Sequence, residues 1–165
     1  MSRAFVKEGD GAEADEPLRR APRIQPCYIT RRGYDAARAA HEALLHEVGG
    51  RKLDEVPLDA RDAFRQQSLR LQELTALLQE TVPVDPPSGP VAEVRFGATV
   101  SLLEPEGRRF ELRLVGEDEA APEQGLLNWR SPLGQRLLGA RVGDEVEWQR
   151  AASVVWLEVL AVRYD

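Results

Sequence analysis

Acidic side chains are the groups in this sequence whose types and spacing could do chemistry. Four of them gather near the middle of the chain: Asp54, Glu55, Asp59 and Asp62. Carboxylates are the ligands that a hard cation such as Mg²⁺ prefers, so acids in such a group could take part in holding one. The simpler interpretation is that they are solvated loop charges and acids near a helix N-terminus, where the helix dipole favours them. We prefer the simpler interpretation.

A second acidic group consists of three consecutive residues, Glu117, Asp118 and Glu119, followed by Ala120, Ala121 and Pro122. Such a run is a poor core element, because buried charges need partners. It therefore predicts a surface loop. Whether this loop contacts a partner or is a solvated turn stays open from the residues alone.

The sequence offers little else for catalysis. His41 and His46 are five residues apart and would face different sides of a helix, which makes a poor metal pair. The single cysteine, Cys27, can form neither an internal disulfide nor a cysteine zinc site. A nucleophile-elbow motif and a glycine-rich phosphate loop are both missing. The sequence predicts a protein that is not an enzyme in its own right and has no metal or cofactor of its own.

Composition points to a protein partner. The formal net charge of −6 argues against a general binder of nucleic acid or of anionic membranes. Hydrophobic residues make up 42% of the chain, enough for a packed core, but no apolar run approaches the roughly 20 residues of a membrane span. The first residues are charged and lack the apolar centre of a signal peptide. We expect a cytoplasmic protein.

Two helices must position the central acids. Residues 34–48 and 58–80 carry apolar side chains at 3-4 spacing, Thr30 can cap the first helix, and Gly49 and Gly50 can end it. The pattern predicts an antiparallel hairpin over 27–82. Pairing Leu44 with Phe64 would place His41 opposite Gln67.

The same pairing would centre the turn on Asp54, so that Asp54 and Glu55 form the tip. Residues 1–26 are poor in apolar side chains and rich in glycine, proline and charges, so we expect them to be disordered.

A β-rich domain should carry the second acidic group. Residues 83–92 hold four prolines and a glycine and predict a linker. Beyond it, over 93–165, the pattern changes to strands, with one short helix at 132–138 that Ser131 should cap. The predicted strands are 94–103, 109–115, 144–149 and 154–164. The predicted fold class is α+β, a helical hairpin followed by an antiparallel sheet with one short helix.

The second domain resembles the C-terminal domain of the bacterial Gre-factor family. The loop V-G-E-D-E-A at 115–120 is similar to the family's central loop, and S-P-L at 131–133 opens a helix like the family's. Further similar segments lie at 94–100, 137–139, 142–144 and 158–164, and Tyr28-Ile29-Thr30 is similar to the start of the family's first hairpin helix.

The resemblance implies an FKBP-like C-terminal domain that docks on the rim of the secondary channel of RNA polymerase. In the family a long hairpin enters that channel, and acidic tip residues help to hold Mg²⁺ in the polymerase active site, which promotes cleavage of backtracked transcripts. The residues that the resemblance suggests for polymerase binding are Glu117, Asp118, Glu119, Ala120, Pro122, Ser131, Pro132 and Arg136.

The hairpin departs from the family pattern. Family helices have roughly thirty residues, about 45 Å, whereas the first helix predicted here has about fifteen, roughly 22 Å. The family's acidic tip motif, of the type D-x-x-E-N, is absent from the corresponding place. The chain is therefore more similar to the shortened-hairpin, Rnk-like subgroup. We expect a regulator of transcription elongation that binds polymerase without strong stimulation of cleavage.

Two alternatives stay open. The protein could be an active cleavage factor that uses Asp54 and Glu55. An FKBP-like domain could also be a prolyl isomerase or chaperone, which needs an aromatic-lined apolar pocket. The aromatic side chains available there are expected mostly to pack in the core; they are Phe96, Phe110, Trp129, Trp148, Trp156 and Tyr164.

Overall fold

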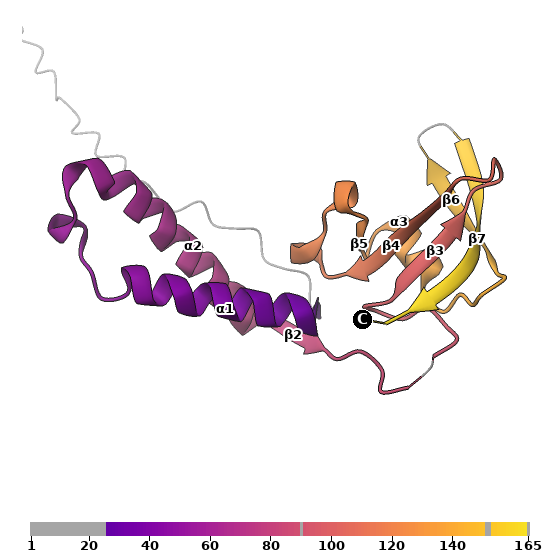
Figure 1. The fold of residues 1–165 in the computed structure, drawn as a ribbon, viewed down its shortest axis with the longest axis horizontal. Helices are drawn as coiled ribbons and strands as arrows, with labels where there is room; N and C mark the ends of the chain where they lie inside the picture. Colours follow the sequence, from indigo (N-terminus) through magenta and orange to yellow (C-terminus); the bar gives the residue numbers. More distant parts are fainter. Residues whose placement is uncertain (1–25, 90, 151–152, 165) are drawn as a thin grey trace, which may run out of the picture.

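The structure, a computed structural model, describes residues 26–89, 91–150 and 153–164. It shows an α+β protein in which a pair of long helices extends from a curled sheet (Figure 1). The expectation that residues 1–26 are disordered lies outside the described residues except for Pro26. Within the described residues, no helix is long and apolar enough to cross a membrane.

Two helices form the first unit: α1 (Arg31–Val48) and α2 (Arg61–Glu80). The predicted cap of α1 is confirmed, because the Thr30 hydroxyl accepts a hydrogen bond from the Gly33 N–H. The helices are joined through two short 3₁₀ turns, Leu53–Glu55 and Leu58–Ala60. Val48 and Val56 are buried at this joined end, so the connection has a small core of its own.

The predicted pairing of the two helices is wrong. His41 hydrogen-bonds to Thr75 at 3.1 Å, and the Gln67 amide donates to Glu47 at 2.9 Å, so His41 and Gln67 are not partners. The residue midway between His41 and Thr75 is Leu58, not Asp54. The physical reason lies in the twelve residues that connect α1 to α2. They form two 3₁₀ turns of their own, so α2 begins later in the sequence than predicted and the midpoint of the hairpin shifts toward α2.

A two-stranded parallel sheet closes the other end of the helix pair. Strand β1 (Cys27–Thr30) pairs with β2 (Thr81–Val84) in the register Cys27↔Thr81 to Thr30↔Val84. The sequence did not predict this parallel pair. It also predicted that the linker starts at residue 83, whereas β2 continues to Val84. Pro83 is tolerated because a proline lacks only the N–H and this strand pairs on one side.

The second unit is a five-stranded sheet. Its strands are β3 (Thr99–Leu103), β4 (Arg109–Val115), β5 (Leu126–Asn128), β6 (Glu145–Arg150) and β7 (Ser153–Arg163). They lie in the order β5-β4-β3-β7-β6. The sheet is mixed and not purely antiparallel as predicted, because β5 runs parallel to β4. Antiparallel pairing holds for the other three neighbours.

One short helix, α3 (Pro132–Leu137), packs beside β6, and Ser131 caps it as predicted. Two 3₁₀ turns, Glu117–Glu119 and Pro122–Gln124, lie in the connection between β4 and β5. This connection is the predicted acidic loop. It lies on the side of the sheet that faces the helices, where β1 contacts the first of the two turns (Figure 1).

The main core belongs to the second unit. Ala98, Val100, Leu102, Leu114, Leu137, Leu157 and Val159 are fully buried there. Alternate side chains of β3 and β7 supply much of this core, since successive residues of a strand face opposite sides. The aromatic side chains were expected mostly to pack in the core, and Trp156 is an exception, because it is 53% exposed on the outer face of the sheet. By contrast, α1 and α2 themselves supply only two buried side chains, Val48 and Leu74.

Candidate functional site

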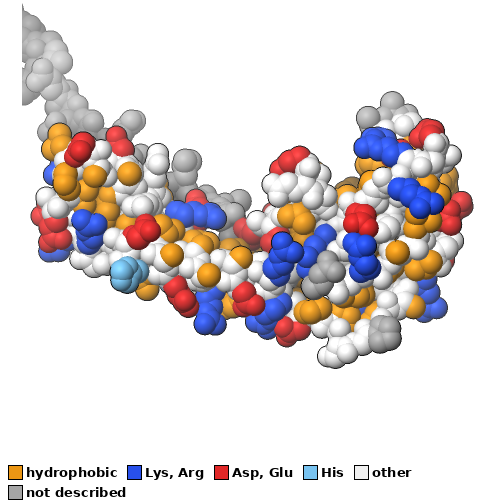
Figure 2. Space-filling view, in the orientation of Figure 1, with side chains coloured by type: hydrophobic (Ala, Val, Ile, Leu, Met, Phe, Trp, Pro, Cys, Tyr) orange, Lys and Arg blue, Asp and Glu red, His pale blue; other side chains and the backbone are white. Residues whose placement is uncertain are grey.

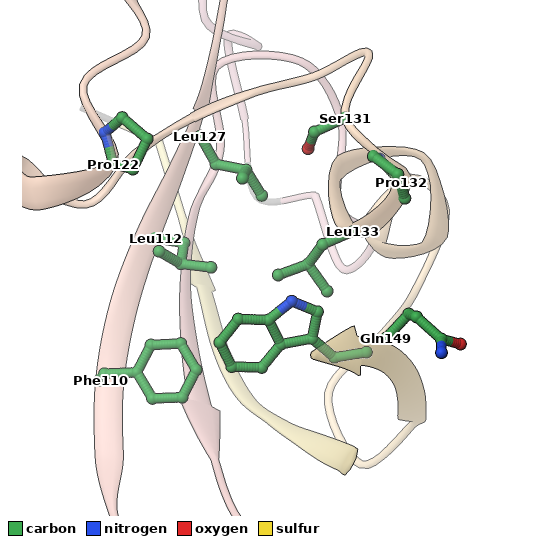
Figure 3. A pocket seen from close by; sticks show the side chains of 9 residues that line it. Phe110, Leu112, Pro122, Leu127, Ser131, Pro132, Leu133 and Gln149 are labelled. Carbon is green, nitrogen blue, oxygen red and sulfur yellow. The ribbon is translucent and has the colours of Figure 1, made fainter. Parts of the chain in front are cut away.

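An apolar pocket opens on the second unit between the sheet and α3. Its volume is about 360 Å³. Phe110, Leu112, Leu127 and Leu133 point into it from three different elements (Figure 3). The remaining lining residues are Pro122, Ser131, Pro132, Trp148 and Gln149.

The strand pattern explains how the pocket forms. Phe110 and Leu112 are two residues apart on β4 and so share one face of the sheet. Trp148 on β6 lies across from Phe110, with ring centroids 6.1 Å apart, and the Arg150 guanidinium stacks 4.7 Å from the Trp148 ring centroid. Two neighbouring aromatic rings therefore line the pocket, which suits a site that receives an apolar side chain.

Three of the predicted polymerase contacts meet at this pocket, although they come from two different loops. Pro122 lies in the 3₁₀ turn before β5, and Ser131 and Pro132 open α3. The Ser131 hydroxyl accepts a hydrogen bond from the Gly134 N–H at 3.1 Å, so it serves as a cap. Arg136 extends from the same helix, but its guanidinium forms a 2.7 Å ion pair with Glu147 on β6.

The acidic loop divides into two parts. Glu117 and Asp118 are exposed, as expected for a contact surface. Glu119 and Ala120 are half-buried, and the Glu119 carboxylate points to the start of α1, where it accepts hydrogen bonds from Thr30. The structure thus directs Glu119 toward the helical unit, a role that the sequence did not indicate.

An aromatic cluster lies beside this contact and joins the two units. The Tyr28 ring on β1 lies 5.9 Å from the Phe96 ring and 5.5 Å from the Trp129 ring, measured between centroids. Phe96 and Trp129 meet edge to face at 6.2 Å. The Arg130 guanidinium stacks over Trp129 and donates to the Pro26 carbonyl at 2.8 Å. We call the contacts of this aromatic cluster and of Arg130, together with those of Glu119 with Thr30, the joint.

Tyr164 holds the segment that carries Phe96. Its hydroxyl donates to the Glu93 carbonyl at 2.7 Å and accepts from the Arg95 N–H at 2.9 Å. Burial raises the pKa of the Tyr164 phenol, so the neutral donor form persists. Arg95 also lowers the pKa of the nearby Glu93 carboxyl through a hydrogen bond. The C-terminal strand therefore ends in a polar network that supports the joint.

Asp54 and Glu55 lie far from this surface, in the turn at the other end of the helix pair (Figure 1). Both side chains are exposed, and Glu55 accepts a hydrogen bond from the Lys52 N–H at 3.1 Å. Among the described residues no three His, Cys, Asp or Glu side chains are grouped as a metal site.

Sequence reasoning missed one residue at this end: Leu58, whose side chain is 82% exposed. A hint of this exposure was the position of the apolar residue directly after Pro57, in the connection between the helices. Acidic and basic side chains alternate over the visible face of the helix pair (Figure 2).

A family of known proteins matches this chain over the pocket-bearing unit. Residues 89–164 match the family described as "Transcription elongation factor, GreA/GreB, C-term". A GreA of Nitratiruptor sp. is 38% identical over 96 residues, and a GreB of Neisseria meningitidis is 39% identical over 102 residues. These alignments cover 58% and 61% of this chain but only 59% and 63% of the relatives, less than two thirds of their length.

One relative aligns along nearly its whole length. A GreA of Chloroflexus aggregans is 30% identical over 154 residues, which is 84% of this chain and 98% of the relative. Among solved structures, a GreA/GreB factor from Nitrosomonas europaea is 22% identical with a TM-score of 0.43, covering 84% of this chain and 98% of the other. The GreA factor homolog 1 of Thermus thermophilus is 24% identical with a TM-score of 0.39 and covers 83% and 98%.

Proposed function

Because this chain belongs to the GreA/GreB family of transcription elongation factors, we propose that it regulates elongation by binding RNA polymerase through the pocket of its second unit. One observation carries the proposal. Two short segments on either side of β5, the 3₁₀ turn Pro122–Gln124 and the start of α3, bring Pro122, Ser131 and Pro132, three of the residues suggested by the family resemblance, to one apolar pocket. We further propose that this unit is FKBP-like and docks on the rim of the secondary channel.

The pocket has the properties of an anchor site in a protein interface. Aromatic and aliphatic side chains line its wall, and Ser131 and Gln149 supply polar groups. A partner side chain that fills such a pocket is desolvated, which is how a few residues carry most of the binding free energy. The exposed Glu117 and Asp118 nearby would add a polar rim that favours a basic partner surface.

The helix pair supports occupancy of the channel more than cleavage. The 18 residues of α1 correspond to about 27 Å, and the 20 residues of α2 to about 30 Å, against about 45 Å for the thirty-residue helices of the family. The Glu55 carboxylate moreover accepts a hydrogen bond from the Lys52 N–H at the start of its own 3₁₀ turn. We therefore propose that transcript cleavage is not strongly stimulated, with a cleavage factor using Asp54 and Glu55 as the alternative. None of the relatives described above points to a prolyl isomerase.

The docking test uses two neighbouring exposed positions of one 3₁₀ turn. Pro122 lines the pocket, whereas Glu123 does not. Pro122→Arg should weaken the binding of purified RNA polymerase about tenfold, which corresponds to about 1.4 kcal/mol. Glu123→Arg should leave binding within about threefold, because a change at the rim of an interface has a small effect. Equal weakening by the two variants would refute docking at the pocket, and no binding by the unaltered protein would refute the function.

A second experiment tests the mode of action. Polymerase complexes stalled in a backtracked state are mixed with this protein, with or without an authentic cleavage factor. We expect no shortening of the RNA by this protein alone and slower shortening when it competes with the cleavage factor. Robust shortening that is lost in the Asp54→Asn/Glu55→Gln double variant would instead establish the alternative.

A further inference from the structure

We propose that Glu119 is a positioning residue that sets the direction of the helix pair relative to the pocket-bearing unit. The proposal starts from a contact between residues 89 positions apart. The Glu119 carboxylate lies at the start of α1 and accepts hydrogen bonds from both the backbone N–H and the hydroxyl of Thr30, the former at 2.8 Å.

The carboxylate connects three structural elements at once. Its Oε2 atom also accepts from the Gly116 N–H at 3.1 Å, which closes the acidic loop on itself. The Thr30 hydroxyl, which donates to Glu119, accepts from the Gly33 N–H at 3.0 Å. A continuous chain of hydrogen bonds therefore runs from the first turn of α1, through its cap, into the loop. The negative charge is also favourable at this helix end.

The two units approach each other closely at two glycines, where a larger residue would not fit. A Cβ atom at Gly33 would collide with the Glu119 carboxylate, and one at Gly116 would collide with the Tyr28 carbonyl oxygen. The backbone φ of Gly116 is −66°, which any residue can adopt, so the need for glycine there is steric. Two glycines, one on each unit, thus let β1 and α1 settle against the acidic loop.

Direction at the joint comes from hydrogen bonds to charged groups: those that Glu119 accepts from Thr30, and the one that the Arg130 guanidinium donates to the exposed Pro26 at 2.8 Å. Glu119 is the one of these two groups that acts on the first turn of α1. The rings of Tyr28, Phe96 and Trp129 pack at 5.5–6.2 Å between centroids in tilted and edge-to-face arrangements, whose geometric preference is modest. Charge-assisted hydrogen bonds are shorter and more sharply oriented. Loss of the Glu119 charge should therefore leave the units in contact while widening the range of directions that the helices take.

The consequence deepens the proposed function and rests on it. The pocket would bind RNA polymerase, and Glu119 would set the direction in which the helix pair extends from the bound unit. Variation in Glu119 should thus leave docking intact while changing where the joined end of the helices lies. Glu117 provides a matched control, since it is an exposed acid of the same 3₁₀ turn with the same charge.

The first measurement needs no polymerase. Spin labels at Leu58→Cys, the exposed joined end, and Val142→Cys, exposed on the second unit, report the distance between the units. Labelling the folded protein leaves the buried Cys27 unreacted, which the mass of the doubly labelled product verifies. We expect one narrow distance peak for the parent and for Glu117→Gln. For Glu119→Gln, the population outside that peak should rise about tenfold.

The opposite outcomes decide against the proposal. An unchanged distribution in Glu119→Gln, or an equal change in Glu117→Gln, would overturn it. If Glu119→Gln does not fold, as judged by circular dichroism, Thr30 tests the same contact from the other side. Thr30→Ser keeps the hydroxyl and should match the parent, whereas Thr30→Ala should broaden the distribution; if the two give the same distribution, the proposal fails.

The second measurement uses the polymerase complex. Half-maximal binding of polymerase should stay within about twofold in Glu119→Gln, because the structure directs the Glu119 carboxylate to Thr30 and Glu119, unlike Pro122, does not line the pocket. At equal occupancy, a thiol at Leu58→Cys should react faster with a maleimide in the Glu119→Gln complex than in the parent complex. A protein that binds no polymerase would refute the proposed function, and the distance measurement would still decide the role of Glu119.

Discussion

Replacement of Gly116 by alanine is the sharpest steric test of the joint. Gly116 lies between β4 and the acidic loop, and it is buried. A Cβ atom there would overlap the Tyr28 carbonyl oxygen and would stand 3.3 Å from the Tyr28 carbonyl carbon and 3.2 Å from Glu119 Oε2. Tyr28 cannot move freely, because β1 pairs with β2 in the register Tyr28↔Val82.

The expected size of the effect follows from this geometry. Extra atoms in a packed site cost about 1–3 kcal/mol, and the upper half of that range applies where the obstructing atoms are backbone. We expect Gly116→Ala to lower the free energy of unfolding by about 2 kcal/mol, or else to detach β1 from the loop. In either case the environment of Trp129, which packs on Tyr28, changes.

The assay is urea unfolding followed by tryptophan fluorescence and by circular dichroism. Gly89→Ala is the control, because a Cβ atom at Gly89 would meet nothing within 4 Å and its φ does not require glycine. That control should stay within about 0.5 kcal/mol of the parent. The reasoning is refuted if Gly116→Ala and Gly89→Ala unfold at the same urea concentration with the same fluorescence change.

Three further outcomes are expected. Leu102→Ala, at a fully buried position of β3, should lower the free energy of unfolding by about 2–5 kcal/mol in the same urea assay, and a loss under 1 kcal/mol would contradict the assigned core. Tyr164→Phe should cost about 1–2 kcal/mol, because the Arg95 N–H and the Glu93 carbonyl lose their shared partner; a neutral result would mean that water replaces the hydroxyl. The hydrogen bond from Arg31 lowers the pKa of the exposed Asp85 carboxyl below its ordinary 3.8, so the small stabilisation from this pair is present above about pH 4 and is lost as the pH falls through the lowered pKa. Thermal unfolding of Asp85→Asn and the parent should therefore converge in acid, and a difference that persists at low pH would disprove the linkage.

Local elements were well predicted, because their signals lie within a few residues of one another. The strand at 109–115 and the caps at Thr30 and Ser131 are confirmed. The first helix begins at Arg31, three residues earlier than predicted, because the helix follows directly after its cap, Thr30. The match to the GreA/GreB C-terminal family also confirms the resemblance drawn from short motifs.

The site could be predicted only in part. Family motifs selected Pro122, Ser131 and Pro132, and the structure adds the hydrophobic wall that makes them one surface. Phe110 and Trp148 were known only as strand residues that should pack, since nothing in a single strand states which other strand lies opposite. The exposure of Trp156 was missed for the same reason, because both faces of β7 are apolar in sequence and only one is covered.

The sequence by itself determined the helices, most strands, their caps and the family, since each depends on side chains that are close along the chain. Tertiary structure alone decided the pairing of His41 with Thr75, the parallel pair of β1 and β2, and the contact of Glu119 with Thr30. These contacts join residues 34 to 89 positions apart. Their partners are selected by how whole units pack, because hydrogen-bonding groups of one type are interchangeable along a sequence and become distinct only when the fold brings one of them within reach.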